Sequence, residues 1–510
     1  MSAARTSRDQ ANSPVIVWFR DDLRLADNPA LREAAATGQP LICVFVLDEV
    51  SAGLRPLGGA ARWWLHGSLE SLDRTLTKAG GRLYLFRGRT AELLPRIATQ
   101  SNASAVFWNR RYGAAERRID DAVEEELLTR GIGVGTFNGH LLYEPRTLTT
   151  RAGEPFRVFS SFWRAAHELG PPPLPQSAPR RLLMQHESHA VEGAVSLSAL
   201  GLQPSGPDWS AGLRGAWTPG EKRAQTRLDR FLEKGIPRYA AFRDRPGENA
   251  SSQLSPYLRF GNVSARQVWH GAAAAEAREP SSFRNLEKFH FELGWREFSY
   301  HLLYHYPDLD SRNLQSQFDR MPWRSDRIAL KAWQTGQTGY PLVDAGMRQL
   351  WTTGWMHNRV RMVVASFLVK HLLIHWREGE SWFWDTLVDA DPASNLVNWQ
   401  WVAGSGADAA PYFRIFNPVL QGEKFDPDGK YVRRWVPELA GLPAAVIHQP
   451  WAASAADLQR AGVSLGENYP ERIVEHQYAR QRALAALKRT ALRARRTQDV
   501  ARACAATRSQ

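Results

Sequence analysis

Val15-Ile-Val-Trp-Phe19 is an uninterrupted apolar run of the length expected for one buried β-strand. Similar runs follow at residues 41–47, 83–86 and 105–108. Between them, residues 61–79 and 114–130 are rich in Leu, Glu, Ala and Arg, which favour helices. Because buried strands alternate with helices, the sequence predicts an α/β domain over residues 14–135, built on a doubly wound parallel sheet.

The polar stretch after this first strand argues against an ordinary dinucleotide site. It reads Arg20-Asp-Asp-Leu-Arg24, where a dinucleotide-binding fold carries G-x-G-x-x-G. No phosphate-binding G-x-x-x-x-G-K-[ST] motif occurs, and Gly404-Ser-Gly406 falls short of a hydrolase G-x-S-x-G elbow. The pairs His301/His305 and His371/His375 have metal-ligand spacing but no evident third ligand, so we expect no metal.

The chain has 510 residues, which exceeds the size at which one hydrophobic core stops growing. Pro, Gly and Ser recur at short intervals from about residue 170 to 220, which indicates a long connector. Beyond Gly220 the pattern is helical almost throughout. We therefore predict a connector at 136–219, a mostly α domain at 220–487 and a basic tail at 488–510.

The net charge of +13 favours a polyanionic partner such as nucleic acid. Only two cysteines are present, so a disulfide framework is not expected and a reducing cytoplasm fits. No uninterrupted apolar stretch of about 18 residues occurs, so we expect no membrane span. We expect a cytoplasmic monomer.

A polar helix face with apolar surroundings is the first candidate site. In Trp355-Met-His-Asn-Arg-Val-Arg-Met362, the residues Asn358, Arg361 and Met362 share one face, and the following turns are strongly apolar. A buried arginine needs a partner. Asp389 or Asp391 can supply it, with Asn395 nearby. Such groups suit the edge of a planar heterocycle, although a purely structural ion pair explains them equally well.

The stretch Asn249-Ala-Ser-Ser-Gln-Leu-Ser255 lies ahead of a helix that we expect near Pro256. Its hydroxyls and backbone N–H groups can bind phosphate. An ordinary helix N-cap is the alternative.

Five ordered motifs, spread from residue 18 to residue 401, resemble the photolyase and cryptochrome family. They are Trp18-Phe-Arg-Asp-Asp-Leu-Arg-Leu-Ala-Asp-Asn28, Trp295-Arg-Glu-Phe298, Thr338-Gly-Tyr-Pro341, Gly354-Trp-Met-His-Asn-Arg359 and Asn398-Trp-Gln-Trp401. The resemblance extends from Val15 to about His476.

This resemblance implies that the helical domain binds FAD in a folded form. The matching residues for its pyrophosphate and ribose are Tyr239, Ser251, Ser252, Leu254 and Ser255. Those around its two ring systems are Asn358, Arg361, Asp389, Asp391 and Asn395. Asn395 matches the residue facing flavin N5, where an amide favours the fully reduced flavin that repair requires. Trp399, Trp376 and Trp323 match the family's tryptophan chain for photoreduction.

The resemblance also implies a substrate, the cyclobutane pyrimidine dimer in UV-damaged DNA, which light-excited flavin splits by electron donation. A dimer must be flipped out of the duplex to reach a buried flavin. Trp295, Trp401 and Met362 match the walls of the lesion pocket, and Glu292 matches a carboxyl that steadies the pyrimidine radical anion. Arg243, Arg359 and Arg414 match phosphate contacts.

Two relatives remain as alternatives. A (6-4) photolyase usually has His where this chain has Met362, and a cryptochrome receptor would lack the lesion pocket that is retained here. Two cysteines cannot ligate the iron-sulfur cluster of another branch. We also expect an antenna pigment in the first domain: methenyltetrahydrofolate, or alternatively 8-hydroxy-deazaflavin or FMN. Residues available for it are Trp63, Trp64, Trp108, Asn109, Arg110 and Arg111, although structural aromatics are equally compatible.

Overall fold

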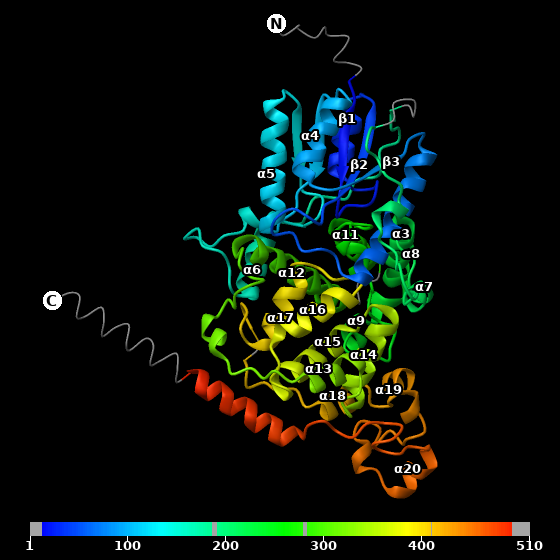
Figure 1. The fold of residues 1–510 in the computed structure, drawn as a ribbon, viewed down its shortest axis with the longest axis vertical. Helices are drawn as coiled ribbons and strands as arrows, with labels where there is room; N and C mark the ends of the chain where they lie inside the picture. Colours follow the sequence, from blue (N-terminus) through cyan, green and yellow to red (C-terminus); the bar gives the residue numbers. More distant parts are fainter. Residues whose placement is uncertain (1–12, 186–190, 279–282, 410, 492–510) are drawn as a thin grey trace, which may run out of the picture. The chain divides into compact units, whose positions relative to one another are not determined.

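The computed structural model describes residues 13–185, 191–278, 283–409 and 411–491. The chain forms two compact units (Figure 1). The first comprises residues 1–240, 252–307 and 387–393, and the second comprises residues 241–251, 308–386 and 394–510.

The first unit contains the predicted parallel sheet. Its strand order is β3(Leu83–Arg87), β2(Leu41–Leu47), β1(Val15–Phe19), β4(Ala105–Asn109), β5(Gly133–Phe137). All neighbouring strands are parallel. The helices between the strands are α2(Pro29–Ala36), α3(Gly59–Lys78), α4(Thr90–Gln100) and α5(Ala114–Thr129). The fold class predicted from the sequence is therefore confirmed.

All five residues of β1 are buried, because its side chains alternate between two faces of the sheet and both faces are covered. Ile16 and Trp18 belong to a core cluster with residues of α4 and α5, and the residues between them point to the opposite side of the sheet. Trp108 of β4 packs edge-on against Trp18 with ring centroids 5.6 Å apart. The sheet is thus buried on both faces, as a parallel sheet requires.

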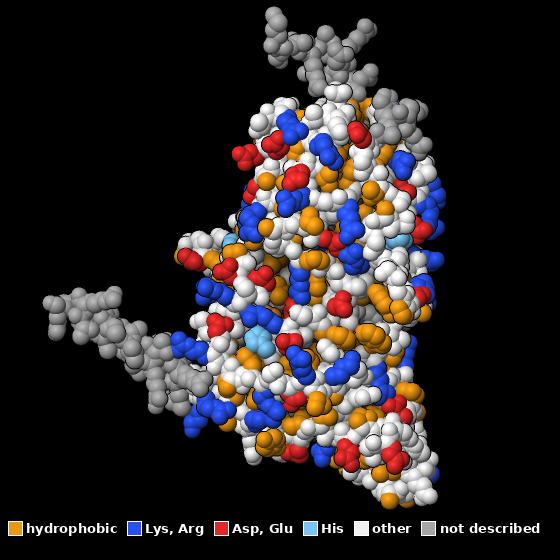
Figure 2. Space-filling model, viewed as in Figure 1, with side chains coloured by type: hydrophobic (Ala, Val, Ile, Leu, Met, Phe, Trp, Pro, Cys, Tyr) orange, Lys and Arg blue, Asp and Glu red, His pale blue; other side chains and the backbone are white. Residues whose placement is uncertain are grey.

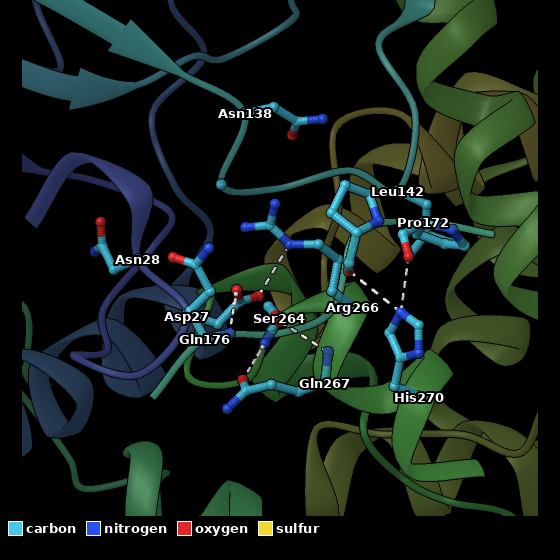
Figure 3. Close-up of polar contacts among 12 residues, drawn as sticks. Asp27, Asn28, Asn138, Leu142, Pro172, Gln176, Ser264, Arg266, Gln267 and His270 are labelled. Carbon is cyan, nitrogen blue, oxygen red and sulfur yellow. Dashed lines mark hydrogen bonds and ion pairs between the residues drawn. The ribbon is translucent and has the colours of Figure 1, made fainter. Parts of the chain in front are cut away.

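The predicted connector is partly helical. It contains α6(Phe159–Glu168) and α7(Ala211–Ala216), and it is tied to α11(Ala265–Arg278) through Asp27 (Figure 3). The Asp27 carboxylate accepts hydrogen bonds from the Gln176 backbone N–H at 3.1 Å and from Arg266 Nε at 3.1 Å. His270 contacts the carbonyl oxygen of Pro172 at 2.9 Å. These contacts hold the Pro-rich segment against a helix, which its composition alone did not reveal.

Three helices and a loop complete the part of the first unit that bears on function. The helices are α8(Glu221–Arg230), the short α10(Ser255–Arg259) and the long α12(Phe283–His305), and the loop is residues 387–393. The predicted boundary at 219/220 divides the chain differently from these compact units, and it stays a prediction.

The second unit is helical, as predicted. Its helices are α13(Arg327–Thr335), α14(Pro341–Thr353), α15(Asn358–Ser366), α16(Trp376–Thr386), α17(Ser394–Ala403), α18(Pro418–Phe425), α19(Lys430–Trp435) and α20(Ala455–Ala461). A further helix covers residues 476–491. Most of the predicted basic tail lies outside the described residues. None of the described helices is long and apolar enough to cross a membrane.

Candidate functional site

The residues expected around a flavin and a DNA lesion fall in both compact units. The first unit holds Tyr239, Ser252, Leu254, Ser255, Glu292, Trp295, Asp389 and Asp391. The second holds Arg243, Ser251, Trp323, Asn358, Arg359, Arg361, Met362, Trp376, Asn395, Trp399, Trp401 and Arg414.

In the first unit, the loop of residues 387–393 presents a buried carboxylate. Asp391 accepts a hydrogen bond from the Tyr300 hydroxyl at 2.7 Å and another from the Ala393 backbone N–H at 3.0 Å. Arg259 Nε donates to the carbonyl oxygen of Ala390 at 2.9 Å, which fixes the loop. Burial and the charge of Asp391 raise the pKa of Tyr300 well above its usual value, so the hydroxyl stays protonated and donates. Sequence reasoning missed Tyr300.

The serine-rich loop also lies partly in the first unit. Leu254 is buried, while the hydroxyl of Ser252 is half-buried and accepts from the Leu254 backbone N–H at 3.4 Å. Gln253 has φ of 52°, a left-handed conformation that produces a sharp turn. The N-cap position of α10 is Leu254, which makes no side-chain cap. The N-cap alternative is therefore not supported at Leu254, and phosphate binding by the serines stays a prediction.

In the second unit, α15 begins at Asn358, as predicted. Asn358 is exposed, and Arg361 and Met362 are half-buried. Arg361 Nε donates to the Met356 carbonyl oxygen at 2.8 Å. The expected pairing of Arg361 with Asp389 or Asp391 stays a prediction, since those carboxylates belong to the other unit.

Asn395 on α17 is held in one orientation by Glu380 of α16. Its Nδ2 donates to Glu380 Oε1 at 2.7 Å and to the Glu380 carbonyl oxygen at 3.1 Å. Both side chains are buried. The Oδ1 atom of Asn395 has no hydrogen-bond partner among the described residues. It is free to accept a hydrogen bond from a ring N–H, so the site fits a reduced flavin. Glu380 was not predicted from the sequence.

Trp399 lies on α17 and packs against α16. Its ring centroid is 5.0 Å from that of Phe383 and 6.3 Å from that of Trp333. A Cβ atom on Gly379 would lie 2.1 Å from Trp399 Cη2, so only glycine allows the indole to come this close. Trp399 is 2% exposed, which makes it a buried aromatic directly next to Asn395 along the helix.

The other two tryptophans of the expected chain belong to the same unit. Trp376 is fully buried, and its Nε1 donates to Asn313 Oδ1 at 2.9 Å. Trp323 is half-buried. The ring of His375 neighbours both, with its centroid 5.2 Å from that of Trp323 and 5.6 Å from that of Trp376.

The expected lesion residues lie on three helices, with Met362 on α15. Glu292 and Trp295 belong to α12, and both are half-buried. One face of the Trp295 indole is covered by Phe159, at a centroid distance of 4.0 Å and an interplanar angle of 7°. Trp401 is half-buried on α17.

The three expected phosphate contacts differ in their local charge partners. Arg359 pairs with Asp244 at 3.0 Å, and Arg243 lies 3.9 Å from the same carboxylate. Arg414 is exposed, and its carbonyl oxygen accepts from the buried Lys370 Nζ at 2.9 Å. On the face in Figure 2, basic side chains are distributed among acidic ones.

The aromatic residues considered for an antenna pigment lie in the interior of the first unit, and their role stays a prediction. Trp63, Trp64 and Trp108 are buried, and Trp64 Nε1 donates to Asn262 Oδ1 at 3.1 Å. A cavity of about 20 Å³ lies where the strand order reverses between β1 and β4, lined in part by Asn109 and Arg111. It has room for about one water molecule, and is too small for a pterin or flavin. Among the described residues, no cluster of His, Cys, Asp or Glu has the arrangement of a metal site.

Comparison with known proteins identifies the class. The family model described as DNA photolyase matches residues 15–180, and the model described as the FAD binding domain of DNA photolyase matches residues 289–489. The chain belongs to the DNA photolyase and cryptochrome family.

Particular members are similar over nearly the whole chain. A deoxyribodipyrimidine photo-lyase of Agrobacterium fabrum is 51% identical over 93% of this chain and 97% of its own length. Cryptochrome-2 of Arabidopsis thaliana is 40% identical over 93% of this chain and 79% of its own.

Solved structures agree with these relatives. A bacterial class III photolyase from Agrobacterium tumefaciens superposes with a TM-score of 0.90 and 49% identity, covering 96% of this chain and 98% of its own. An archaeal photolyase from Sulfolobus tokodaii, solved with two FAD molecules, gives a TM-score of 0.77 and 30% identity over 93% and 100%.

Proposed function

We propose that this chain is a deoxyribodipyrimidine photo-lyase, an enzyme that splits cyclobutane pyrimidine dimers in DNA under light. The observation that carries the proposal is the buried Asn395, which Glu380 holds with its amide oxygen free. A receptor needs no fixed acceptor for a reduced ring, whereas a repair enzyme depends on the reduced form.

Bound FAD, when reduced and excited by light, supplies the electron that opens the cyclobutane ring. Ser251, Ser252 and Ser255 would hold its phosphates and ribose with Tyr239 and Leu254. Asn358, Arg361, Asp389 and Asp391 would surround its rings. Asn395 Oδ1 would accept the ring N–H and thereby favour the reduced form over the oxidised form.

The lesion would bind against the indoles of Trp295 and Trp401, with Met362 beside it. Flat apolar side chains bind unstacked bases without sequence preference. Glu292 would hydrogen-bond the pyrimidine edge and stabilise the negative charge that develops on it. Arg243, Arg359 and Arg414 would contact phosphates, which adds affinity rather than sequence selection.

The comparisons support a DNA repair enzyme better than a light receptor. The photo-lyase relative is more similar than the cryptochrome relative, and this chain covers nearly all of it. Met362 stands where a (6-4) enzyme usually carries His. Trp399, Trp376 and Trp323 would pass electrons inward to reduce the cofactor.

We further propose an antenna pigment, with methenyltetrahydrofolate as the first candidate and 8-hydroxy-deazaflavin or FMN as alternatives. The archaeal relative solved with two FAD molecules supports a second pigment in general. Absorption and mass spectra of pigment extracted from the purified protein would decide among the three candidates. We also propose that the enzyme acts in the cytoplasm, because its substrate is DNA, and that it acts as a monomer.

The test is anaerobic repair. Purified protein, chemically reduced, is mixed with an oligonucleotide that carries one thymine dimer, and restored thymine is measured after blue or near-UV light and after darkness. Light-dependent repair that is lost in E292Q and W295A supports the proposal. Photoreduction of bound flavin without dimer splitting would overturn it in favour of the receptor, with a (6-4) substrate as the next test.

A further inference from the structure

Arg377 places a positive charge beside Trp376. Its guanidinium carbon lies 5.0 Å from the centroid of the Trp376 ring. Nε donates to the Asp310 carbonyl oxygen at 3.2 Å, and Nη2 is buried without a hydrogen-bond partner in the described part of the chain. Within the same residues, no carboxylate pairs with this guanidinium. Among them, no carboxylate in contact with the Arg377 guanidinium therefore offsets the effect of its charge on Trp376.

Trp323 has a different electrostatic environment. Its ring neighbour is His375, and burial together with the charge of Arg377 lowers the pKa of His375 to about 4. The imidazole is therefore uncharged at neutral pH. The adjacent Arg324 pairs with Asp326 at 3.2 Å. Among the described residues, no arginine or lysine stacks on the Trp323 ring.

The two indole N–H groups also differ. Trp376 Nε1 donates to an amide oxygen, that of Asn313, and an amide is too weak a base to remove its proton. Trp376 therefore keeps its proton when it is oxidised. Asp319 accepts from Asn313 Nδ2 at 2.6 Å and also acts on His375. Asp319 is therefore linked both to Asn313, the partner of Trp376, and to His375, the ring neighbour of Trp323. Trp323 Nε1, in contrast, is buried with no partner in the described chain.

We propose that Arg377 gives the last step of photoreduction its direction, from Trp323 to oxidised Trp376. The inference rests on the proposed function, in which the three tryptophans form the route. In this step one electron leaves the Trp323 indole and fills the vacancy on Trp376, which returns to its neutral form. Trp323 becomes a radical cation and loses its Nε1 proton once water reaches the half-buried side chain. An external thiol then supplies the electron that restores it.

The direction follows from Coulomb's law. A cation over Trp376 raises the energy of a second positive charge there more than on the more distant Trp323. At about 5 Å and the effective dielectric of a partly buried site, one unit charge shifts such an equilibrium by roughly tenfold or more. Arg377 acts only through the effect of its charge on Trp376, and it takes no part in bond changes.

The experiment compares R377Q with wild type, both loaded with FAD and excited by a short flash. Transient absorption gives the yield of the long-lived, deprotonated tryptophan radical, a spectroscopic signature separate from repair activity. We expect this yield to fall about threefold to tenfold in R377Q and to be retained in R377K. The matched control is R434Q, because Arg434 lies 5.0 Å from the Trp435 ring, outside the route, and this variant should leave the yield unchanged.

An R377Q protein that binds FAD normally and gives a wild-type radical yield overturns the role of Arg377. If R377Q does not retain FAD, the radical yield is measured in R377M instead, because methionine keeps the apolar stem of the side chain. The tryptophan route is tested separately with W323F and W376F. If these variants form the long-lived radical as wild type does, the route itself is wrong. If they lose it while R377Q keeps it, only the Arg377 proposal fails.

Discussion

Nδ2 of Asn395 and Oε1 of Glu380 lie 2.7 Å apart, and this buried contact joins α17 to α16. An amide can present either its oxygen or its nitrogen to a ligand, and a carboxylate accepts but does not donate. The contact therefore determines which end of the Asn395 amide is left for the flavin.

We predict that the Asn395 amide is no longer held in one orientation in E380A. Removing the carboxylate leaves Nδ2 with only the backbone carbonyl oxygen of residue 380 as an acceptor. The lost hydrogen bond costs about 1–3 kcal/mol, which rotation of the amide would relieve. The reduced flavin should then reoxidise faster in air, as measured by recovery of oxidised-flavin absorbance. E380Q retains an acceptor oxygen and should lie between E380A and wild type. Equal reoxidation rates in all three proteins would contradict this assignment.

We predict that G379A displaces Trp399. The added methyl group would lie 2.1 Å from Cη2, so the indole must shift, and overpacking of this kind costs about 1–3 kcal/mol. The midpoint of urea unfolding should fall, and flavin photoreduction should slow because the first tryptophan has moved. G215A is the matched control, since a Cβ atom there meets nothing within 4 Å. Normal photoreduction in G379A would count against Trp399 as the first donor.

We predict that R414Q lowers the salt dependence of binding to damaged DNA. Removing one phosphate contact reduces the slope of log K against log salt by about 0.9. Filter binding over a series of NaCl concentrations measures this slope. R460Q is the control, because Arg460 is exposed and pairs with Asp457 at 2.9 Å. A slope unchanged from wild type in R414Q would remove Arg414 from the interface.

We predict that Lys370 makes stability depend on pH. Burial and the nearby charge of Arg414 lower the pKa of Lys370 to about 7, from 10.5 in the unfolded chain. Below pH 7 the ammonium is charged in both states. Between pH 7 and 10.5 the unfolded chain binds one more proton than the folded chain, so the free energy of unfolding rises with pH, by at most about 1.4 kcal/mol per unit.

The test of Lys370 is urea unfolding of wild type and K370M at pH 6, 7.5 and 9. The difference in unfolding free energy, wild type minus K370M, should increase with pH above 7. A constant difference would show that Lys370 keeps its proton in the folded protein.

The fold was largely predictable because four strands are uninterrupted apolar runs. The fifth, Gly133–Phe137, was missed: it lies at the edge of the sheet, is only partly buried and carries two glycines, so neither run nor alternation identifies it. The Pro-rich segment was assigned as a connector because the contacts of Asp27 with Gln176 span 149 positions and leave no local trace.

The candidate site was predicted through motif resemblance, and its supporting contacts were not. Asn313 lies in a loop, 63 positions from the Trp376 that it binds. Tyr300 and Glu380 sit in helices where tyrosine and glutamate are unremarkable. Their roles depend on what the fold brings against them, Asp391 in one case and Asn395 in the other.

The loop of residues 387–393 has a consequence for recombination between relatives. It belongs to the first unit, although the helices on either side of it, α16 and α17, belong to the second. In a chimera that joins the first 307 residues of this chain to the remainder of a relative, the relative's loop would have to make the contacts with Tyr300 and Arg259. A chimera with a single junction would therefore fold compatibly only when the relative has, at position 391, a side chain that accepts the hydrogen bond from the Tyr300 hydroxyl.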